Sequence, residues 1–321
     1  MRTLFVHVGP AKTGTSAVQH YFCSTPSRAV AYPHVGLWAD GSHHNLVLSF
    51  FGDNSRPEAR VEPPEVLFAQ LREVAAQDER DMLLSSEALA RHDGGEFIGR
   101  VSEELGLDRL VVICVCREHF ERASSLYNQM VKDAFHSEVR DPSDYVATSA
   151  KSLTYRPLVA RLTDAGFELR VLSYHPSSTL VQRFADCVGH EPEGGGLEAP
   201  QRNVSLAPKG LIPLLLANRL VPDAEERKRC FERLQRLPGL YQPSRFIFDP
   251  CRVASAAQTF EADRAFLRDR FGLELPEVNL DERQDAFGIT PDEFRQIQET
   301  LGDAPAAGAT ILERLGEYVR G

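Results

Sequence analysis

Short apolar runs alternate with amphipathic segments along the first two-thirds of the chain. Residues 4–8 and 82–85 form apolar runs of strand length, and residues 169–173 form another. The run at residues 110–115, LVVICV, is continuously apolar, which is typical of a central parallel strand that helices cover on both faces. The segment at 16–22 places its apolar side chains at helical spacing. This alternation predicts an α/β fold around a central parallel sheet.

The alternation of apolar runs and amphipathic segments ends after residue 190. Residues 191–200 hold a GGG run and two prolines and are predicted to form a loop, after which the patterns are helical. Thr290, Pro291 and Glu293 form a strong helix start, with Thr as the cap and Glu three residues later. We therefore expect an α/β core at 1–200 and a C-terminal helical lobe at 201–321. Residues 30–63 break the alternation and are expected to be an insertion over the ligand-binding edge of the sheet.

Composition and charge exclude several classes of protein. The chain has 321 residues, 42% of them hydrophobic and 26% charged, which is ample for a sizeable core. Its formal net charge of −10 argues against a general nucleic-acid or anionic-membrane surface. No apolar run reaches membrane-spanning length, and MRTLFVHVGP enters a strand directly, without the pattern of a signal peptide. The six cysteines are scattered, with no zinc-type spacing, so we expect reduced thiols and a cytoplasmic location.

A glycine-rich turn, GPAKTGTS at residues 9–16, lies between the first strand and the first helix. Backbone N–H groups of such a turn point toward an anion, and the helix dipole and the Lys12 ammonium add positive potential. The turn is not a Walker A loop, because Lys12 lies two residues before Gly14 and not immediately before the final Ser or Thr. The residues predicted to bind phosphate are Lys12, Thr13, Gly14, Thr15 and Ser16.

The stretch FVHVGPAKTGTSAVQHYF at residues 5–22 resembles the 5′-phosphosulfate loop of sulfotransferases, in their bacterial and carbohydrate-directed branch. The resemblance covers about residues 3–210. It implies a P-loop-containing, three-layer α/β fold. It also implies 3′-phosphoadenylyl sulfate (PAPS) as the sulfuryl donor, adenosine 3′,5′-bisphosphate (PAP) as the product, and no required metal.

Later residues extend this resemblance. In sulfotransferases an Arg at the end of a strand and a Ser eight positions later hold the 3′-phosphate of the donor, and Arg117 and Ser125 have this spacing. The planar fork of Arg117 suits phosphate. Tyr174 in RVLSYHP matches a Tyr that contacts the nucleoside, and Lys209 matches a basic residue near the 3′-phosphate.

Two candidates for a general base follow from the residues. Glu87 ends the strand pattern MLLSSE, where the carboxyl edge of the sheet should open on the donor, and carbohydrate sulfotransferases use a Glu in this role. His43 and His44 in GSHHNL are the alternative, because imidazole titrates near neutral pH. Adjacent histidines without carboxylate or thiol partners do not predict a metal site.

The sequence thus predicts a PAPS-dependent sulfotransferase acting on a hydroxyl of a glycan, a glycolipid or a small molecule. A small-molecule kinase is an alternative that the position of Lys12 disfavours. A non-catalytic nucleotide-binding protein with the same fold is a third interpretation. The acceptor and the oligomeric state are open at this point.

Overall fold

A computed structural model describes residues 1–55, 59–91, 93–133, 136–193, 208–234, 237, 248–280, 289–301 and 306–318. The chain forms two compact units. The first comprises Met1–Glu118, Tyr155–Arg202 and Ala262–Pro276. The second comprises His119–Thr154, Asn203–Glu261 and Glu277–Gly321.

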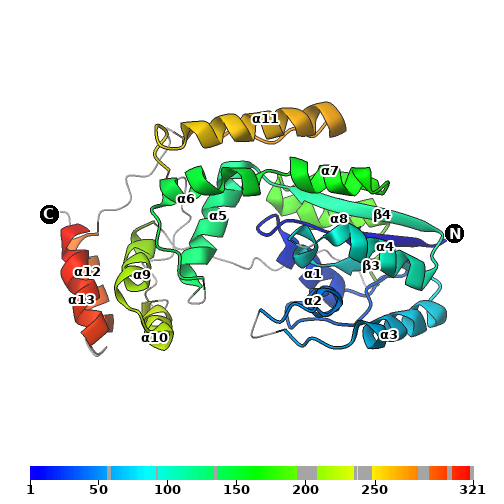
Figure 1. Ribbon diagram of the computed structural model, residues 1–321, viewed down its shortest axis with the longest axis horizontal. Helices are drawn as coiled ribbons and strands as arrows, with labels where there is room; N and C mark the ends of the chain where they lie inside the picture. Colours follow the sequence, from blue (N-terminus) through cyan, green and yellow to red (C-terminus); the bar gives the residue numbers. More distant parts are fainter. Residues whose placement is uncertain are drawn as a thin grey trace. The chain divides into compact units, whose positions relative to one another are not determined.

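The first unit contains a five-stranded sheet in which all neighbouring strands are parallel. Its strands are β1 (Thr3–His7), β2 (Val30–Ala31), β3 (Asp81–Ser85), β4 (Arg109–Cys116) and β5 (Glu168–Ser173). Their order across the sheet is β2-β3-β1-β4-β5, so β3, β1 and β4 are interior strands. Figure 1 shows the chain with β3 and β4 labelled. The four strands expected from the apolar runs are all present, which confirms the predicted α/β class with a central parallel sheet.

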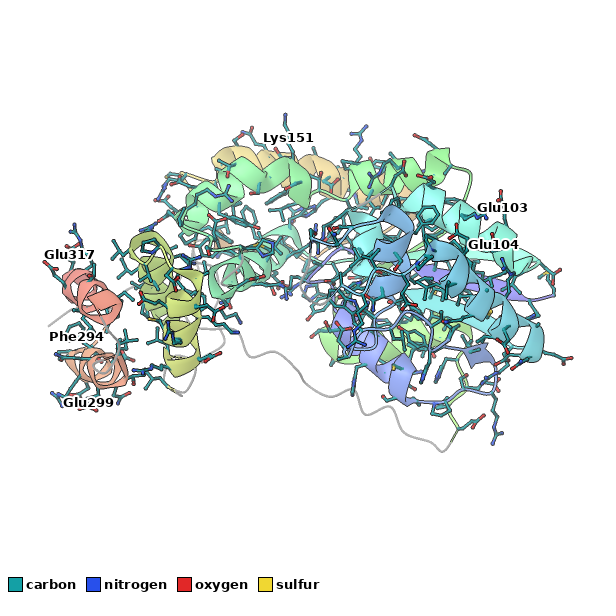
Figure 2. All side chains as sticks on the ribbon, turned by 60° about the horizontal axis from the view of Figure 1, so that its bottom comes forward. Glu103, Glu104, Lys151, Phe294, Glu299 and Glu317 are labelled. Atoms are coloured by element: carbon teal, nitrogen blue, oxygen red, sulfur yellow. The ribbon has the colours of Figure 1, made fainter. Side chains whose placement is uncertain are left out.

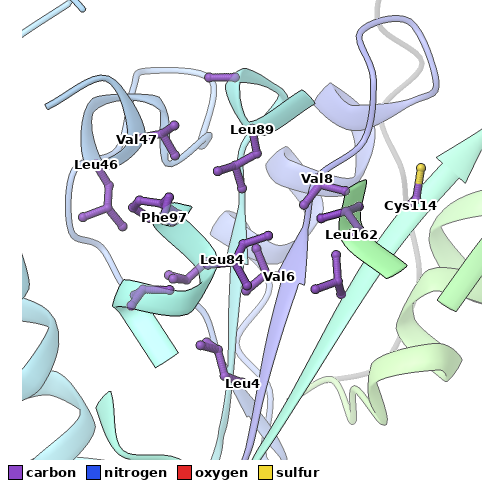
Figure 3. Close-up of a cluster of buried hydrophobic side chains, with 14 of the residues drawn as sticks. Leu4, Val6, Val8, Leu46, Val47, Leu84, Leu89, Phe97, Cys114 and Leu162 are labelled. Carbon is purple, nitrogen blue, oxygen red and sulfur yellow. The ribbon is translucent and has the colours of Figure 1, made fainter. Parts of the chain in front are cut away.

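Helices cover both faces of this sheet. On one face lie α1 (Thr15–Ser24) and α8 (Leu180–Val188), whose apolar side chains share a cluster with the strands. Against the other face pack α2 (His44–Phe51), α3 (Pro64–Gln77), α4 (Gly94–Leu105) and α7 (Arg156–Asp164). Figure 3 shows this second cluster, where side chains from β1, β3 and β4 meet those of α2, α4 and α7. The first unit is therefore built in three layers.

The position of strand β4 inside the sheet explains why its sequence is continuously apolar. Val111 and Ile113 point into the cluster with α1 and α8, whereas Val112 and Cys114 point into the opposite cluster. Successive side chains of a strand alternate between faces, so a strand covered on both sides needs apolar residues throughout. A surface helix shows the contrast: in α4, Phe97 is buried in the cluster of Figure 3, while Glu103 is exposed, as Figure 2 shows.

The segment at residues 30–63, expected as an insertion, begins inside the sheet. Val30 pairs with Asp81 and Ala31 with Met82, so β2 forms one edge of the sheet beside β3. A strand of two residues is too short to show alternation in the sequence. The same segment then supplies α2, whose buried side chains pack into the cluster of Figure 3.

The regular elements among the described residues of the second unit are all helices, joined by turns and loops. Its helices are α5 (His119–Lys132), α6 (Pro142–Ser149), α9 (Pro208–Leu220), α10 (Ala224–Leu234), α12 (Pro291–Leu301) and α13 (Ala306–Leu315), with α11 (Ala254–Phe271) beginning in this unit. They share one apolar core. The predicted start of α12 is confirmed: Glu293 accepts from the Thr290 N–H at 3.0 Å, and its own N–H donates to Thr290 Oγ1 at 3.3 Å. In the described part of the chain, no helix combines the length and apolarity needed to cross a membrane.

Candidate functional site

The sheet brings four of the predicted residues to one edge of the first unit. Lys12 lies in the loop that follows β1, and Glu87 lies two residues beyond the end of β3. Arg117 directly follows β4, and Tyr174 directly follows β5. Because parallel strands all end at the same edge of a sheet, these side chains surround the carboxyl edge, where α/β proteins bind ligands.

The loop at residues 9–16, hereafter the glycine loop, requires both of its glycines. A Cβ atom at Gly9 would lie 2.6 Å from the Nε2 atom of His7. Gly14 has a φ of 87°, and a Cβ there would collide with Leu180 and crowd Tyr174. Only glycine tolerates both the left-handed backbone and the absence of space. The glycines therefore let the loop pack tightly over the end of β1.

Five consecutive backbone N–H groups of the glycine loop, those of residues 12–16, have no acceptor among the described residues. The N–H groups of Ala17 and Val18 donate to the Gly14 carbonyl at 3.1 and 3.2 Å. Within the described residues, those of residues 12–16 donate to no protein atom. Consecutive unpaired N–H groups at the start of a helix, here α1, form a cradle that attracts anions.

Hydroxyl groups in the glycine loop are mostly engaged within the protein. Thr13 Oγ1 donates to the Pro10 carbonyl at 2.8 Å, and Thr15 Oγ1 donates to Glu87 Oε2 at 2.8 Å. Both threonines are buried, whereas Ser16 is exposed. A hydroxyl has one proton to donate. In this arrangement, Thr13 and Thr15 can donate to an anion through their backbone N–H groups but not through their hydroxyls.

Lys12 occupies the tip of the glycine loop in a strained backbone conformation. Its φ of 70° is left-handed, which costs an L-residue about 1–2 kcal/mol. The side chain is half-buried and forms no salt bridge with any described residue. Burial lowers the pKa of the Lys12 ammonium; the negative charge of Glu87 opposes this shift, and the positive charge of Arg117 adds to it. Such strain is typical of functional loops, where the surrounding structure maintains it.

Arg117 is held by aromatic and backbone contacts beside the glycine loop. Its guanidinium lies over the ring of Tyr174, 4.6 Å from the centroid, and its Nη1 donates to the Lys12 carbonyl at 3.2 Å. The Tyr155 hydroxyl accepts from the Arg117 N–H at 2.9 Å and donates to the Arg117 carbonyl at 2.7 Å. These contacts hold the Arg117 side chain beside Lys12 and Tyr174, all three of them in the first unit.

Two predicted donor contacts belong to the second unit. Ser125 lies on α5 and is half-buried. Lys209 lies near the start of α9, and its side chain is outside the described residues. Their expected contacts with the donor therefore stay predictions from the sequence.

Glu87 lies at the start of a short 3-10 turn, Glu87–Ala90, that follows β3. The Ser86 hydroxyl caps this turn by accepting from the Ala88 N–H at 3.3 Å. Glu87 is half-buried, and its Oε2 accepts a hydrogen bond from the Thr15 hydroxyl, with 2.8 Å between the oxygens. Its carboxylate also attracts the Lys12 ammonium. The carboxylate is thus held at the sheet edge, next to the glycine loop.

His43 is fully engaged with the backbone. Its Nδ1 accepts from the Ser85 N–H at 3.1 Å, and its Nε2 lies 2.9 Å from the Pro33 carbonyl, to which it donates. Burial lowers the pKa of His43 to about 4, against weaker opposing effects of these hydrogen bonds. The neutral His43 ring thus uses both nitrogens to hold the loop at residue 33 against the end of β3. Because neither nitrogen is available to an acceptor molecule, this geometry disfavours a role of His43 in proton transfer.

His44 contacts Ser86, the residue directly before Glu87. Its Nδ1 is 2.8 Å from Ser86 Oγ, and its ring packs edge-on against Trp38 with 4.7 Å between centroids. The Trp38 indole N–H is anchored on Asn45 Oδ1 at 2.8 Å. His44 therefore supports the segment that carries Glu87.

Sequence reasoning missed two residues that shape the site. His7 ends β1 fully buried, with Nδ1 2.9 Å from Ser85 Oγ and Nε2 beneath Gly9, and burial lowers its pKa to about 3. The signal for it was a histidine inside the apolar run TLFVH. Tyr155, which fixes the backbone of Arg117, carried no signal beyond its place in an apolar helix pattern.

The buried histidines predict that the protein loses stability as the pH falls. The folded pKa of His43 is about 4, below its ordinary 6.5, so the unfolded chain binds a proton that the folded chain excludes. The stabilisation is complete above pH 6.5 and is lost toward pH 4, amounting to about 3 kcal/mol for this residue. We expect the unfolding free energy, measured in urea at several pH values, to fall less steeply in His43→Asn than in the wild type. His20→Asn, at a partly exposed site, is the control and should keep the wild-type slope. Equal slopes for wild type and His43→Asn would contradict this account.

No protein-family model matches the sequence, and no curated protein matches it. A function for this chain is therefore inferred from its sequence motifs and from the geometry of the glycine loop and its neighbours.

Proposed function

We propose that the protein is a sulfotransferase that moves a sulfuryl group from PAPS to an acceptor hydroxyl. One observation carries the proposal: among the described residues, Lys12 is half-buried without a salt bridge, and the N–H groups at 12–16 of its loop have no acceptor. Partial burial of a cation is unfavourable unless an anion compensates it. This arrangement suits the 5′-phosphosulfate of the donor.

The neighbouring residues suit the rest of the donor. Arg117 presents a planar guanidinium that can bind phosphate through paired N–H groups, and its contact with the Lys12 carbonyl joins it to the glycine loop. We assign it to the 3′-phosphate of the donor. Tyr174, under the guanidinium, is assigned to the nucleoside. These assignments make PAP the product that the site should retain.

The transfer divides its chemistry between Glu87 and Lys12. Glu87 takes the proton of the acceptor hydroxyl, whose oxygen forms the new bond to sulfur. The bond between sulfur and the bridging phosphate oxygen breaks, and its electron pair stays on that oxygen. Lys12 and the loop N–H groups stabilise the resulting charge on PAP. A sulfuryl group carries less charge than a phosphoryl group, so the proposed step uses no metal.

Glu87 is the better candidate for the base. Its carboxylate lies at the sheet edge beside the glycine loop, within the influence of the Lys12 charge. His43 spends both ring nitrogens on backbone groups, and the Nδ1 atom of His44 is directed to Ser86. We therefore assign proton removal to Glu87 and supporting roles to the two histidines.

The acceptor class follows from the resemblance to carbohydrate-directed sulfotransferases: we propose a glycan, a glycolipid or a small-molecule alcohol. The six cysteines are all free thiols, which supports a reducing compartment, the cytoplasm.

Replacement of Glu87 tests the proposed function. We expect Glu87→Gln to slow sulfuryl transfer by about 100- to 10,000-fold, because the amide cannot take the acceptor proton. The measurement is transfer from radiolabelled PAPS to a panel of sugar and small-molecule alcohols. Affinity for PAP, measured by calorimetry, should stay within about twofold of wild type. The control is Glu103→Gln, at the exposed side chain on α4, which should transfer at the wild-type rate (Figure 2).

Two outcomes would contradict this assignment. Wild-type transfer rates in Glu87→Gln would remove Glu87 as the base and return the role to His44. PAP binding by the wild type without transfer to any alcohol would favour a nucleotide-binding protein without this activity.

A further inference from the structure

The hydroxyl of Thr15 is directed at the carboxylate of Glu87 and not at the anion cradle. Thr15 Oγ1 donates to Glu87 Oε2 at 2.8 Å, and the threonine is 3% exposed. We propose that Thr15 is a positioning residue that orients Glu87 for proton removal, and that its hydroxyl does not bind the donor. This inference rests on the proposed sulfotransferase function.

Packing fixes the direction of the Thr15 hydroxyl. The methyl group of Thr15 faces Gly9 so closely that a Cβ atom on Gly9 would lie 2.8 Å from it. β-branched side chains have few allowed rotamers in a helix, and Thr15 is the first residue of α1. With its methyl against Gly9, the side chain keeps its oxygen on Glu87.

The hydrogen bond joins two segments that leave adjacent strands. Thr15 follows the loop after β1, Glu87 follows β3, and β1 pairs with β3 along the sheet. The bond therefore ties the base to the donor-binding loop. A base held in this way keeps its distance from the transferred group, and such preorganisation contributes to rate.

The contact also divides the carboxylate into two differently employed oxygens. Oε2 accepts from Thr15, while Oε1 accepts from no group among the described residues. Oε1 is then the oxygen that takes the acceptor proton. Thr15 has one hydroxyl proton and donates it in the hydrogen bond to Glu87. The phosphosulfate is then bound by Lys12, the exposed Ser16 and the loop N–H groups.

The loop offers a matched control for this inference. Thr13 is also buried, and its hydroxyl donates to the Pro10 carbonyl at 2.8 Å, within the loop itself. Thr13→Val and Thr15→Val remove the same chemical group from the same loop. Only the second substitution removes a bond to Glu87.

The experiment measures PAP affinity by calorimetry and release of sulfate from radiolabelled PAPS with water as the acceptor. We expect Thr15→Val to keep PAP affinity within about twofold while slowing sulfate release at least about 10-fold. Thr15→Ser, which restores the hydroxyl, should recover most of the rate. Thr15→Ala repeats the measurement without the added methyl group, in case valine disturbs the packing against Gly9.

A double-mutant cycle separates positioning from donor binding. In a Glu87→Ala background, Thr15→Val should slow sulfate release no further, because its effect acts through Glu87. Thr13→Val should cause the same fold-change in both backgrounds. Independent multiplication of the Thr15→Val and Glu87→Ala effects, or a loss of PAP affinity above about 10-fold in Thr15→Val, would overturn the inference alone. Absence of PAP binding in the wild type would overturn the proposed function as well.

Discussion

Replacing Lys12 with alanine should lower sulfuryl transfer by about 100- to 1,000-fold, the usual loss when one charged or hydrogen-bonding stabiliser of a developing oxyanion is removed. The reason is that Lys12 is the cation of the glycine loop and forms no salt bridge with the described residues. The protein should stay folded, because the side chain is half-buried at a loop tip and forms no salt bridge with the described residues. Initial rates with radiolabelled PAPS, together with a thermal melt, measure both effects.

A second lysine provides the control for this experiment. Lys151 is exposed in a 3-10 turn of the second unit, and Lys151→Ala removes an equal charge without touching the glycine loop (Figure 2). It should transfer at the wild-type rate. A near-normal rate in Lys12→Ala would remove Lys12 from the stabilisation of the leaving group.

Replacing Arg117 with alanine should weaken PAP binding by about 10- to 100-fold, which corresponds to the loss of charge-assisted hydrogen bonds. The effect should depend on the ligand. Adenosine 5′-monophosphate lacks the 3′-phosphate, so its affinity should change much less than that of PAP. Calorimetry with both nucleotides on the wild type and the variant gives the fold-change in affinity for each nucleotide, and the two fold-changes are compared.

Two further variants define what Arg117 contributes. Arg117→Lys keeps the charge but loses the planar fork and the stacking on Tyr174, so it should recover only part of the affinity. Arg109 begins β4, the strand that Arg117 follows, and it forms a salt bridge with Glu168 at 2.5 Å. Arg109→Ala should leave PAP binding unchanged. Equal losses of affinity for PAP and adenosine 5′-monophosphate in Arg117→Ala would contradict the assignment to the 3′-phosphate.

The sheet was predictable because its strands are buried on both faces. The run at 110–115 needed apolar side chains in both directions, and the structure directs Val111 and Val112 into opposite clusters. Strand β2 escaped prediction because two residues, paired only at the sheet edge, leave no periodic pattern. The membership of α5 in the second unit also escaped, because it depends on long-range packing that a local pattern does not contain.

The candidate site was predictable in its positions and less so in its contacts. Chain order alone places Lys12, Glu87, Arg117 and Tyr174 beyond the ends of strands, and a parallel sheet then gathers them at one edge. Side-chain partners are set by packing between segments that are distant in sequence. The engagement of the Thr15 hydroxyl by Glu87 is such a case, since 72 positions separate the two residues.

We propose that the carboxyl edge of the sheet binds an adenosine with phosphates on both its 5′ and 3′ positions. Calorimetric titration of the wild-type protein with PAP in the presence of a chelator tests it most directly, with ATP titrated in parallel, with and without Mg²⁺. We predict that PAP binds one site without metal and more tightly than ATP under either condition. Failure of PAP to bind, with ATP binding only when Mg²⁺ is present, would contradict the claim and identify a kinase-like site instead.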